Sequence, residues 1–437
     1  MNNFYSNKPK YCFMVAFLYS TFFAISIPLA SIETSLEIAS APNPVAPGAR
    51  SLGAGGTSIT LSDDATSAYF NPAQLIRLLK KEFSIGFCKM RRKEQLLSGK
   101  YPGSMDAHHV SARNINFASV TYPFSLYNRN MVVSLSYQEL YDFNRDWKLN
   151  LYDNMNIDYL QYGQLTALAM AYCIQIKESI SFGITLNYFD NDITNNQWNQ
   201  KYNLSIQMSD TWLRNYSKEE VYTFKGWNAN IGLLWRMKNL TFGAIIKTPF
   251  VANIKHDIHI SEMDSDNNTI TPKESYEERK EKLEMPMSYG IGISYKYSHQ
   301  FIVAVDFYRT QWDNFIYRDE KGNENSPING KSASLSNTNP THQVRMGCEY
   351  RFIDRKNKRI IPVRAGVFYD PAPSTGCPDN IYGVSFGFGL TQKLFSFDIA
   401  YQYRFGNNIG KDTLKHLNFS QDVKEHKLHL SFILYSY

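Results

Sequence analysis

Beyond residue 30 the sequence lacks an apolar run of the roughly 20 residues that a membrane-spanning helix requires. From about residue 82 onward it also lacks the 3.6-residue apolar periodicity of amphipathic helices. No repeat of propeller-blade length is present. These absences exclude a helical membrane protein and argue against a β-propeller.

Strong charge and paired metal ligands are also missing. The formal net charge is +6, and removing residues 1–30 with Lys8 and Lys10 leaves about +4, too little and too dispersed for a nucleic-acid partner. After that removal four cysteines remain, without metal-ligand spacing, and the sequence cannot decide whether any of them pair: Cys88, Cys173, Cys348 and Cys377. We therefore expect no metal and no cofactor.

Three segments contain residues that occur in catalytic or ligand-binding motifs, but their surroundings in the sequence do not fit those motifs. Gly383-Val-Ser385-Phe-Gly387 matches a nucleophile elbow by letters, but it lies inside an alternating segment, so Ser385 is predicted to be a small lumen residue. His256 and His259 fall in a predicted loop without a third ligand and are expected to be solvent-exposed. Gly53–Gly56 lacks the Lys-Ser/Thr of a phosphate loop. The sequence predicts no catalytic residue, and a lipid hydrolase would need a Ser-His pair within reach.

What the chain does contain is alternation of apolar with polar or small residues. In 179–189, Ile180, Phe182 and Ile184 share one face, whereas Ser181 and Gly183 share the other. Fourteen such runs are found, near 82–90, 115–123, 130–138, 164–176, 179–189, 225–236, 239–247, 287–297, 300–309, 341–352, 360–369, 381–392, 394–405 and 426–437. This pattern predicts an all-β fold, a 14-stranded antiparallel transmembrane β-barrel in the bacterial outer membrane.

The connections between these runs alternate between short and long. Short ones include Lys177-Glu178, Met237-Lys238 and Ser298-His299, and long ones cover roughly 91–114, 139–163, 190–224, 248–286, 310–340, 370–380 and 406–425. Short periplasmic turns and long external loops are typical of outer-membrane barrels. In 394–405 the alternation puts Asp398 and Arg404 in the lumen, and Trp227 and Trp235 would mark two aromatic girdles.

The two termini carry targeting signals. Residues 1–30 resemble a secretory signal peptide, with an uncleaved anchor helix as the alternative. Residues 31–81 are then predicted to be an N-terminal hatch, and residues 82–437 the barrel. The terminal Tyr437, on an amphipathic last run, resembles the signal read by the outer-membrane assembly machinery.

Residues 42–81 do not alternate. Arg50–Thr57 is rich in turn residues, and Ser62 can cap a short helix that begins with Asp63 and Asp64. Asn71 and Pro72 form a second helix start that leads into Ala73. Two short helices could plug the lumen or remain a periplasmic extension, and the sequence leaves both open.

These segments resemble a known family, the FadL-type long-chain fatty acid transporters. The similar segments are Ala49-Arg-Ser-Leu-Gly-Ala-Gly-Gly, Ser62-Asp-Asp-Ala-Thr-Ser-Ala-Tyr-Phe, Asn71-Pro72-Ala73, Gly226-Trp-Asn-Ala-Asn-Ile-Gly232, Pro286-Met-Ser-Tyr-Gly-Ile-Gly292, Val303-Ala-Val-Asp306 and Arg364-Ala-Gly-Val-Phe-Tyr-Asp-Pro-Ala-Pro373. The resemblance implies a hatch-plugged barrel that admits a hydrophobic ligand. It also implies lateral exit through a kinked third strand, but Met131–Tyr137 has no Gly or Pro to mark a kink.

A fatty acid would need an apolar channel with a cation for its carboxylate. Lys247, Arg345 and Arg364 have lumen parity and are candidate cations, although Glu349 and Asp306 could pair with them instead. Three aromatic residues in the predicted external loops could form a landing surface or simply pack between loops: Trp198, Trp212 and Phe250.

The sequence thus predicts a monomeric transporter for passive uptake of hydrophobic compounds, in particular long-chain fatty acids. Its partners would be the small hydrophobic molecule and outer-membrane lipid. The alternative is a barrel component of a secretion system that docks other proteins through its long polar loops, such as 310–340.

Overall fold

The protein is described here by a computed structural model that covers residues 46–99, 107–151, 154–209, 212–266, 269–411 and 418–436. The expected signal peptide, the beginning of the hatch segment and Tyr437 lie outside these residues. In the described part no helix is long and apolar enough to cross a membrane. None of the four cysteines within these ranges forms a disulfide.

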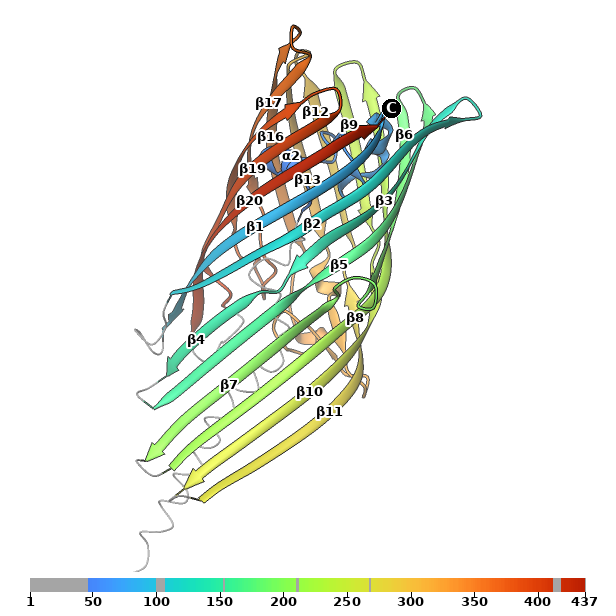
Figure 1. Cartoon of the computed structure of the whole chain (residues 1–437). Coiled ribbons are helices and arrows are strands. Elements are labelled where there is room, and N and C mark those ends of the chain that lie inside the picture. Colours follow the sequence, from blue (N-terminus) through green and yellow to red (C-terminus); the bar gives the residue numbers. More distant parts are fainter. Residues whose placement is uncertain are drawn as a thin grey trace, which may run out of the picture.

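A closed antiparallel barrel of fourteen wall strands makes up most of the chain (Figure 1). Ten walls are single strands, and the other four are interrupted strands: β3/β4, β6/β7, β9/β10 and β11/β12. The bounds are β1 (Lys81–Ser98), β2 (Ala107–Leu126), β3 (Arg129–Asp142), β4 (Arg145–Leu151), β5 (Met155–Lys177), β6 (Ile180–Asp190), β7 (Gln197–Ser209), β8 (Trp212–Met237), β9 (Leu240–Lys247), β10 (Phe250–Asp266), β11 (Thr269–Met285), β12 (Ser288–Lys296), β13 (Phe301–Thr310), β16 (Thr341–Asp354), β17 (Arg359–Tyr369), β18 (Tyr382–Thr391), β19 (Phe395–Ile409) and β20 (Phe419–Ser436).

The barrel closes where β1 pairs with β20, from Lys81 opposite Ser436 to Ser98 opposite Phe419. Two-residue turns join β5 to β6 and β8 to β9, at one end of the barrel. Outer-membrane barrels place short turns on the periplasmic side, so this end, uppermost in Figure 1, is periplasmic. The predicted strand number and antiparallel order are confirmed.

Strand length is where the sequence prediction was wrong. The segments 91–114, 139–163, 190–224 and 248–286 were predicted to be loops, but the structure continues them as paired strands. Figure 1 shows β7, β8, β10 and β11 extending far below the other walls. Outside the bilayer neither face of a strand must be apolar, so the alternation fades while the backbone still pairs.

The register of the membrane band agrees with the alternation. Trp227 is 67% exposed on the outer face of β8, and Trp235 is also exposed. Asp398 is 1% exposed and Arg404 is buried, both in the lumen. Since charge on the lipid face is unfavourable, this register is the one expected for a barrel in a bilayer.

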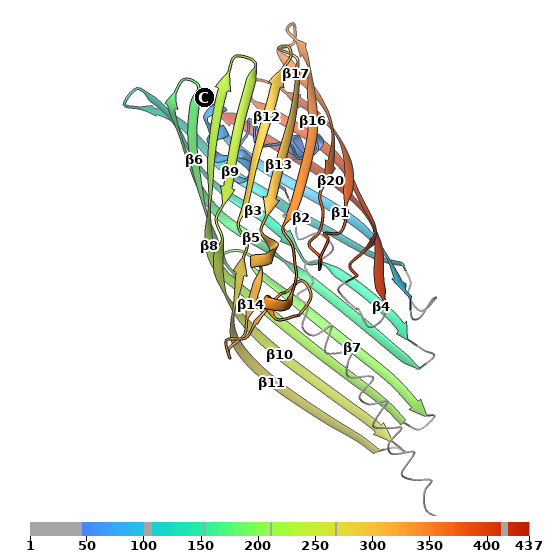
Figure 2. The same cartoon turned by 180° about the vertical axis from the view of Figure 1, so that it is seen from behind.

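Between β13 and β16 the chain is largely irregular, as predicted for 310–340. It contains η2 (Trp312–Asn314), β14 (Ile316–Arg318), β15 (Glu324–Asn325) and η3 (Ala333–Leu335). Figure 2 shows this segment, in orange, beside the extracellular half of the barrel. Trp312 and Phe315 are buried in the same apolar cluster as the barrel residue Phe224, so the segment packs into the lumen side of the wall.

The hatch lies inside the lumen, where the sequence had left a periplasmic extension open. It consists of α2 (Ala49–Gly53), α3 (Ser67–Phe70) and η1 (Pro72–Arg77). The predicted Asn71 cap is confirmed, because its side-chain oxygen accepts from the Ala73 N–H at 3.1 Å. The predicted Ser62 cap is wrong, since α3 begins only at Ser67. The Asp64 carboxylate instead accepts from the Thr66 N–H at 2.9 Å, and burial raises the pKa of this carboxyl.

Close packing fixes the hatch against the wall. Asn71 donates to the Ile59 carbonyl at 2.9 Å and to the barrel carbonyl of Leu233 at 3.1 Å. A Cβ added at Gly366 would lie 2.3 Å from the Gly55 backbone nitrogen. Further glycines on the wall approach hatch atoms just as closely: Gly183, Gly232, Gly243, Gly292, Gly347 and Gly387. Small residues on the wall therefore make room for the hatch backbone.

The third wall is interrupted even though its sequence has no Gly or Pro. The register of β3 shifts between Glu139 and Tyr141, and the strand restarts as β4 after Asn144. The described ladder between β2 and β3 begins only at Phe117 opposite Gln138. Within Met131–Tyr137, where the sequence has no Gly or Pro, both ladders run without a register shift. The interruption lies beyond this run, where Phe143 donates to the carbonyl of Gly163, a residue with a φ of +138°.

Candidate functional site

A cavity of about 120 Å³ lies between the extracellular side of the hatch and the barrel wall. The hatch contributes Tyr69 and Phe70, the two aromatic residues directly before Asn71-Pro72. The wall contributes mainly apolar side chains, including Leu140, Leu165, Phe189, Phe224, Phe250 and Met285, and η2 adds Trp312. Since the lining is largely aromatic and the hatch forms the floor, the cavity suits an apolar guest that rests on the hatch.

Aromatic contacts hold the cavity wall in place. The rings of Phe189 and Phe250 are stacked at 5.5 Å, and Phe224 meets Phe189 edge to face at 5.5 Å. Trp198 stacks on Tyr222 at 4.9 Å and belongs to the same apolar cluster. Phe250, which was predicted to lie in an external loop, is the first residue of β10 and lines the cavity, whereas Trp198 packs beside it.

Two of the predicted cations reach this cavity. The Lys247 ammonium lies 3.7 Å from the centre of the Tyr69 ring and forms no ion pair or hydrogen bond with any residue that the structure describes. Arg345 is already engaged, because its guanidinium donates to the Gly55 carbonyl at 3.2 Å and pairs with Asp370 at 3.2 Å. Lys247 is therefore the cation with capacity for an external anion.

The other predicted residues lie elsewhere. Arg364 is buried at the opposite side of the hatch, with Glu349 and Asp398 each at 2.6 Å. It does not line the cavity, so the internal ion pairing considered for these cations holds for Arg364. Trp212 begins β8 at its extracellular end, and its side chain is outside the described part. Sequence reasoning missed Tyr69 and Phe70, although their position before the Asn71 cap was a usable signal.

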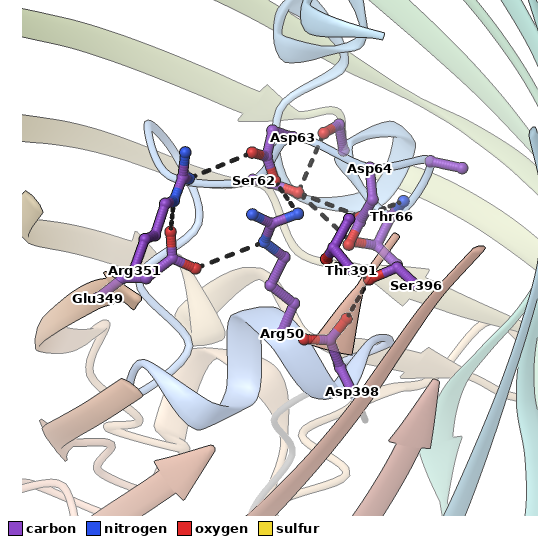
Figure 3. Close-up of polar contacts among 12 residues, drawn as sticks. Arg50, Ser62, Asp63, Asp64, Thr66, Glu349, Arg351, Thr391, Ser396 and Asp398 are labelled. Carbon is purple, nitrogen blue, oxygen red and sulfur yellow. Dashed lines mark hydrogen bonds and ion pairs between the residues drawn. The ribbon is translucent and has the colours of Figure 1, made fainter. Parts of the chain in front are cut away.

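On the periplasmic side, an ionic cluster joins the hatch to the wall (Figure 3). Arg50 of α2 pairs with Asp63, and its Nε lies 3.6 Å from Glu349 of β16. Arg351 bridges the same two carboxylates. We call Arg50, Asp63, Glu349 and Arg351 the hatch latch. Because two members belong to the hatch and two to the wall, the latch ties them together electrostatically.

Ser385 also contacts the hatch. Its hydroxyl accepts from the Gly55 N–H at 2.8 Å and donates to the Gly53 carbonyl at 3.1 Å. It is a fully buried lumen residue inside β18, as predicted from the alternation. Its described contacts are those of a hatch anchor.

The prediction that His256 is solvent-exposed was wrong, because its segment is a strand. The ring is 3% exposed, and its two nitrogens lie 3.0 Å from carboxylate oxygens of Glu220 and Glu281. It stacks on Tyr222 at 4.0 Å. His256 pairs with Tyr222, which lies on β8 five residues from Trp227 toward the extracellular end. The cluster therefore lies in the extracellular extension of the barrel.

This cluster predicts a pH-dependent extension. Burial lowers the pKa of His256, but hydrogen bonds to Glu220 and Glu281 outweigh it and raise the pKa above its ordinary value of 6.5. A raised histidine pKa stabilises the folded form at low pH, and this contribution is lost as pH rises through the folded value. We expect the amides of β10 and β11 to be less protected at about pH 9 than at about pH 6, where the ring is charged, once their exchange rates are corrected for the intrinsic base-catalysed increase with pH.

The matched variants are His256→Gln and His259→Gln. His256→Gln should remove the pH difference, whereas His259→Gln, on a ring that stacks on Tyr276, should keep it. Lys218 and the Tyr317 hydroxyl face the same carboxylates, so the experiment should stay below the range where lysine titrates. Equal protection of these amides at both pH values in the wild-type protein would contradict the prediction.

Comparison with known proteins gives the family. Outer membrane protein transport proteins (OMPP1/FadL/TodX) match this chain over residues 48–430. A solved Pseudomonas aeruginosa FadL homologue superposes with a TM-score of 0.63 at 14% identity, covering 90% of this chain and 99% of its own. No curated protein sequence matches.

Two further solved structures share the fold. The Pseudomonas putida toluene transporter TodX gives a TM-score of 0.55 at 13% identity, with 89% of this chain and 97% of TodX covered. The monoaromatic hydrocarbon channel CymD gives 0.53 at 15% identity, with 90% and 98% covered. The structural likeness shows the fold, and the family match spans most of the sequence. This chain belongs to the family of outer membrane transport proteins that includes FadL and TodX.

Proposed function

We propose that this protein mediates passive uptake of hydrophobic molecules that carry a carboxylate, as long-chain fatty acids do. The observation that carries the proposal is Lys247, a cation in an aromatic-lined cavity that has no ion pair with any described residue. A buried charge without a counter-ion is costly, and a carboxylate that binds there would remove that cost. The apolar lining would then hold the hydrocarbon part of the same molecule.

An uncharged aromatic cargo is a second candidate. The solved structures of TodX and CymD are described as a toluene transporter and a monoaromatic hydrocarbon channel. The rings of Phe189, Phe224 and Phe250 around the cavity also suit such a guest. The two candidates differ in one respect, because only the carboxylate cargo gains from the Lys247 charge.

Two elements offer ways out of the cavity. The hatch forms its floor through Tyr69 and Phe70, and the interrupted wall at β3/β4 adjoins it through Leu140 and Tyr141. Asn114 bridges the interruption by donating to Glu139 at 2.9 Å and to Gln164 at 3.2 Å. Side-chain bonds can part without breaking a strand ladder, so lateral exit there is our proposal for the route.

The test compares Lys247→Met with the wild-type protein in lipid nanodiscs, titrated with dodecanoate, dodecanol and toluene. Methionine keeps the length and apolar stem of lysine and removes its charge. Because hydrogen bonds to charged groups contribute about 1.5–3 kcal/mol, dodecanoate binding should weaken about 10- to 100-fold in the variant. Dodecanol and toluene should bind both proteins equally.

Lys238→Met is the control, since Lys238 lies exposed in the turn between β8 and β9. If the charge of Lys247 has no effect on dodecanoate but toluene binds saturably, the aromatic cargo is the right one. If none of the three compounds binds saturably, uptake of hydrophobic molecules loses its support. The alternative hypothesis, a docking role in a secretion system, would then be tested by pull-down of partner proteins.

A further inference from the structure

A second cavity lies on the other side of the hatch, at the periplasmic end of the barrel. Its volume is about 250 Å³. It is lined by the end of the hatch and by the periplasmic ends of β1, β16, β17, β18 and β20, and its charged side chains are those of Arg50, Asp63, Arg77, Lys80, Glu82 and Arg351. Four of these side chains are cationic and two are acidic, so the lining has an excess of positive charge.

The two carboxylates of this periplasmic cavity are already in use. Asp63 pairs with both Arg50 and Arg351 in the hatch latch. Glu82 accepts from the Ala65 N–H of the hatch at 2.6 Å. Lys80 also has contacts, because its ammonium donates to the Lys393 carbonyl at 3.1 Å and lies over the Tyr435 ring.

Arg77 differs from these residues. It ends η1, is partly exposed to the periplasmic cavity and forms no ion pair or hydrogen bond within the described ranges. Burial is the main reason that the pKa of Arg77 falls to about 10; Asp63 opposes the fall, whereas neighbouring arginines add to it. A guanidinium with five donors, placed among other cations, is a fitting partner for an anion from outside.

We propose that Arg77 and its cationic neighbours bind an oxyanion, a carboxylate or phosphate, that is attached to an apolar group. The apolar part would lie on Leu79, which is 88% exposed, and on Ile360 and Pro362 beside it. Arginine presents its donors in a fork that matches both oxyanions. The site stands on this geometry alone and does not depend on the proposed function.

Equilibrium binding in nanodiscs tests the site, with octanoate, octanol and inorganic phosphate as probes and empty nanodiscs as the partition blank. Arg77→Gln should weaken the binding of octanoate about 10- to 100-fold at one class of site. Octanol binding should not change. Arg77→Lys keeps the charge but loses the donor fork, so its affinity for octanoate should lie between those of the wild-type protein and Arg77→Gln. If phosphate binds in an Arg77-dependent manner and octanoate does not, the site is supported with phosphate as its oxyanion.

Lys356→Gln is the matched control, because Lys356 is exposed in the turn between β16 and β17 at the same end. Hydrogen exchange of residues 46–80 should be unchanged in Arg77→Gln, which excludes loss of the hatch as the cause. Equal binding by Arg77→Gln, Lys356→Gln and the wild-type protein would overturn the proposal. Failure of the Lys247 test alone would leave the Arg77-dependent site intact, so the two ideas fail separately.

Discussion

Replacing Glu349 with alanine is expected to release the hatch from the wall while the barrel stays folded. The Glu349 carboxylate contacts three guanidinium groups, those of Arg50, Arg351 and Arg364, and its side chain is almost fully buried. Breaking a buried ion pair by removing one partner costs about 3–5 kcal/mol. Arg50 of the hatch would lose its pair with the wall and keep only Asp63, whereas Arg351 and Arg364 would lose a partner within the wall, so only the Arg50 share of this cost falls on the contact between hatch and wall.

Hydrogen exchange resolves this effect by segment. Residues 46–80 should lose protection in Glu349→Ala, whereas the amides of the β16–β19 ladders should keep theirs. Asp354→Asn is the control, because Asp354 forms an exposed pair with Arg359 at 2.9 Å. Exposed pairs contribute about 0–1 kcal/mol, so this change should leave the hatch protected. A protected hatch in Glu349→Ala would show that the latch is dispensable.

A larger side chain at Gly366 should expel the hatch by steric exclusion. In Gly366→Val the new Cβ would lie 2.3 Å from the Gly55 nitrogen and 2.4 Å from the Ala54 carbonyl carbon, both backbone atoms. Over-packing of flexible side chains costs about 1–3 kcal/mol, and a clash with backbone on both sides has less room to relax. The barrel ladder itself accepts valine, which favours strands.

Conductance in planar bilayers measures the result, since an emptied lumen conducts ions and a plugged one conducts few. Gly366→Val should raise the ion conductance well above that of the wild-type protein. Ala365→Val is the control, because residue 365 faces away from the hatch on the same strand. Unchanged conductance in Gly366→Val, in a protein that remains folded, would mean that the hatch shifts locally and stays in place.

Some features of this protein follow from local sequence patterns, and others depend on contacts between distant parts of the chain. Alternation with a period of two is a local property, so the sequence predicted the strands, the strand number and the lumen position of Asp398 and Ser385. The Asn71-Pro72 helix start was equally local and was found. In β11, by contrast, residues 271–278 are exposed on both faces and the sequence from Lys273 to Glu284 carries no apolar stripe, so the strand was missed.

Which of the lumen cations are paired depends on residues that are distant in the sequence. Lys247, Arg345 and Arg364 were equivalent by parity, yet Arg364 pairs with Glu349 and Asp398 across neighbouring strands. Among the described residues Lys247 has no ion pair, and its ammonium lies over the Tyr69 ring of the hatch. Whether a cation has a counter-ion depends on which strands are its neighbours and on where the hatch lies. The local sequence pattern predicts neither. The sequence therefore determined the barrel and its two faces, and the tertiary structure decided which charges remain to bind a ligand.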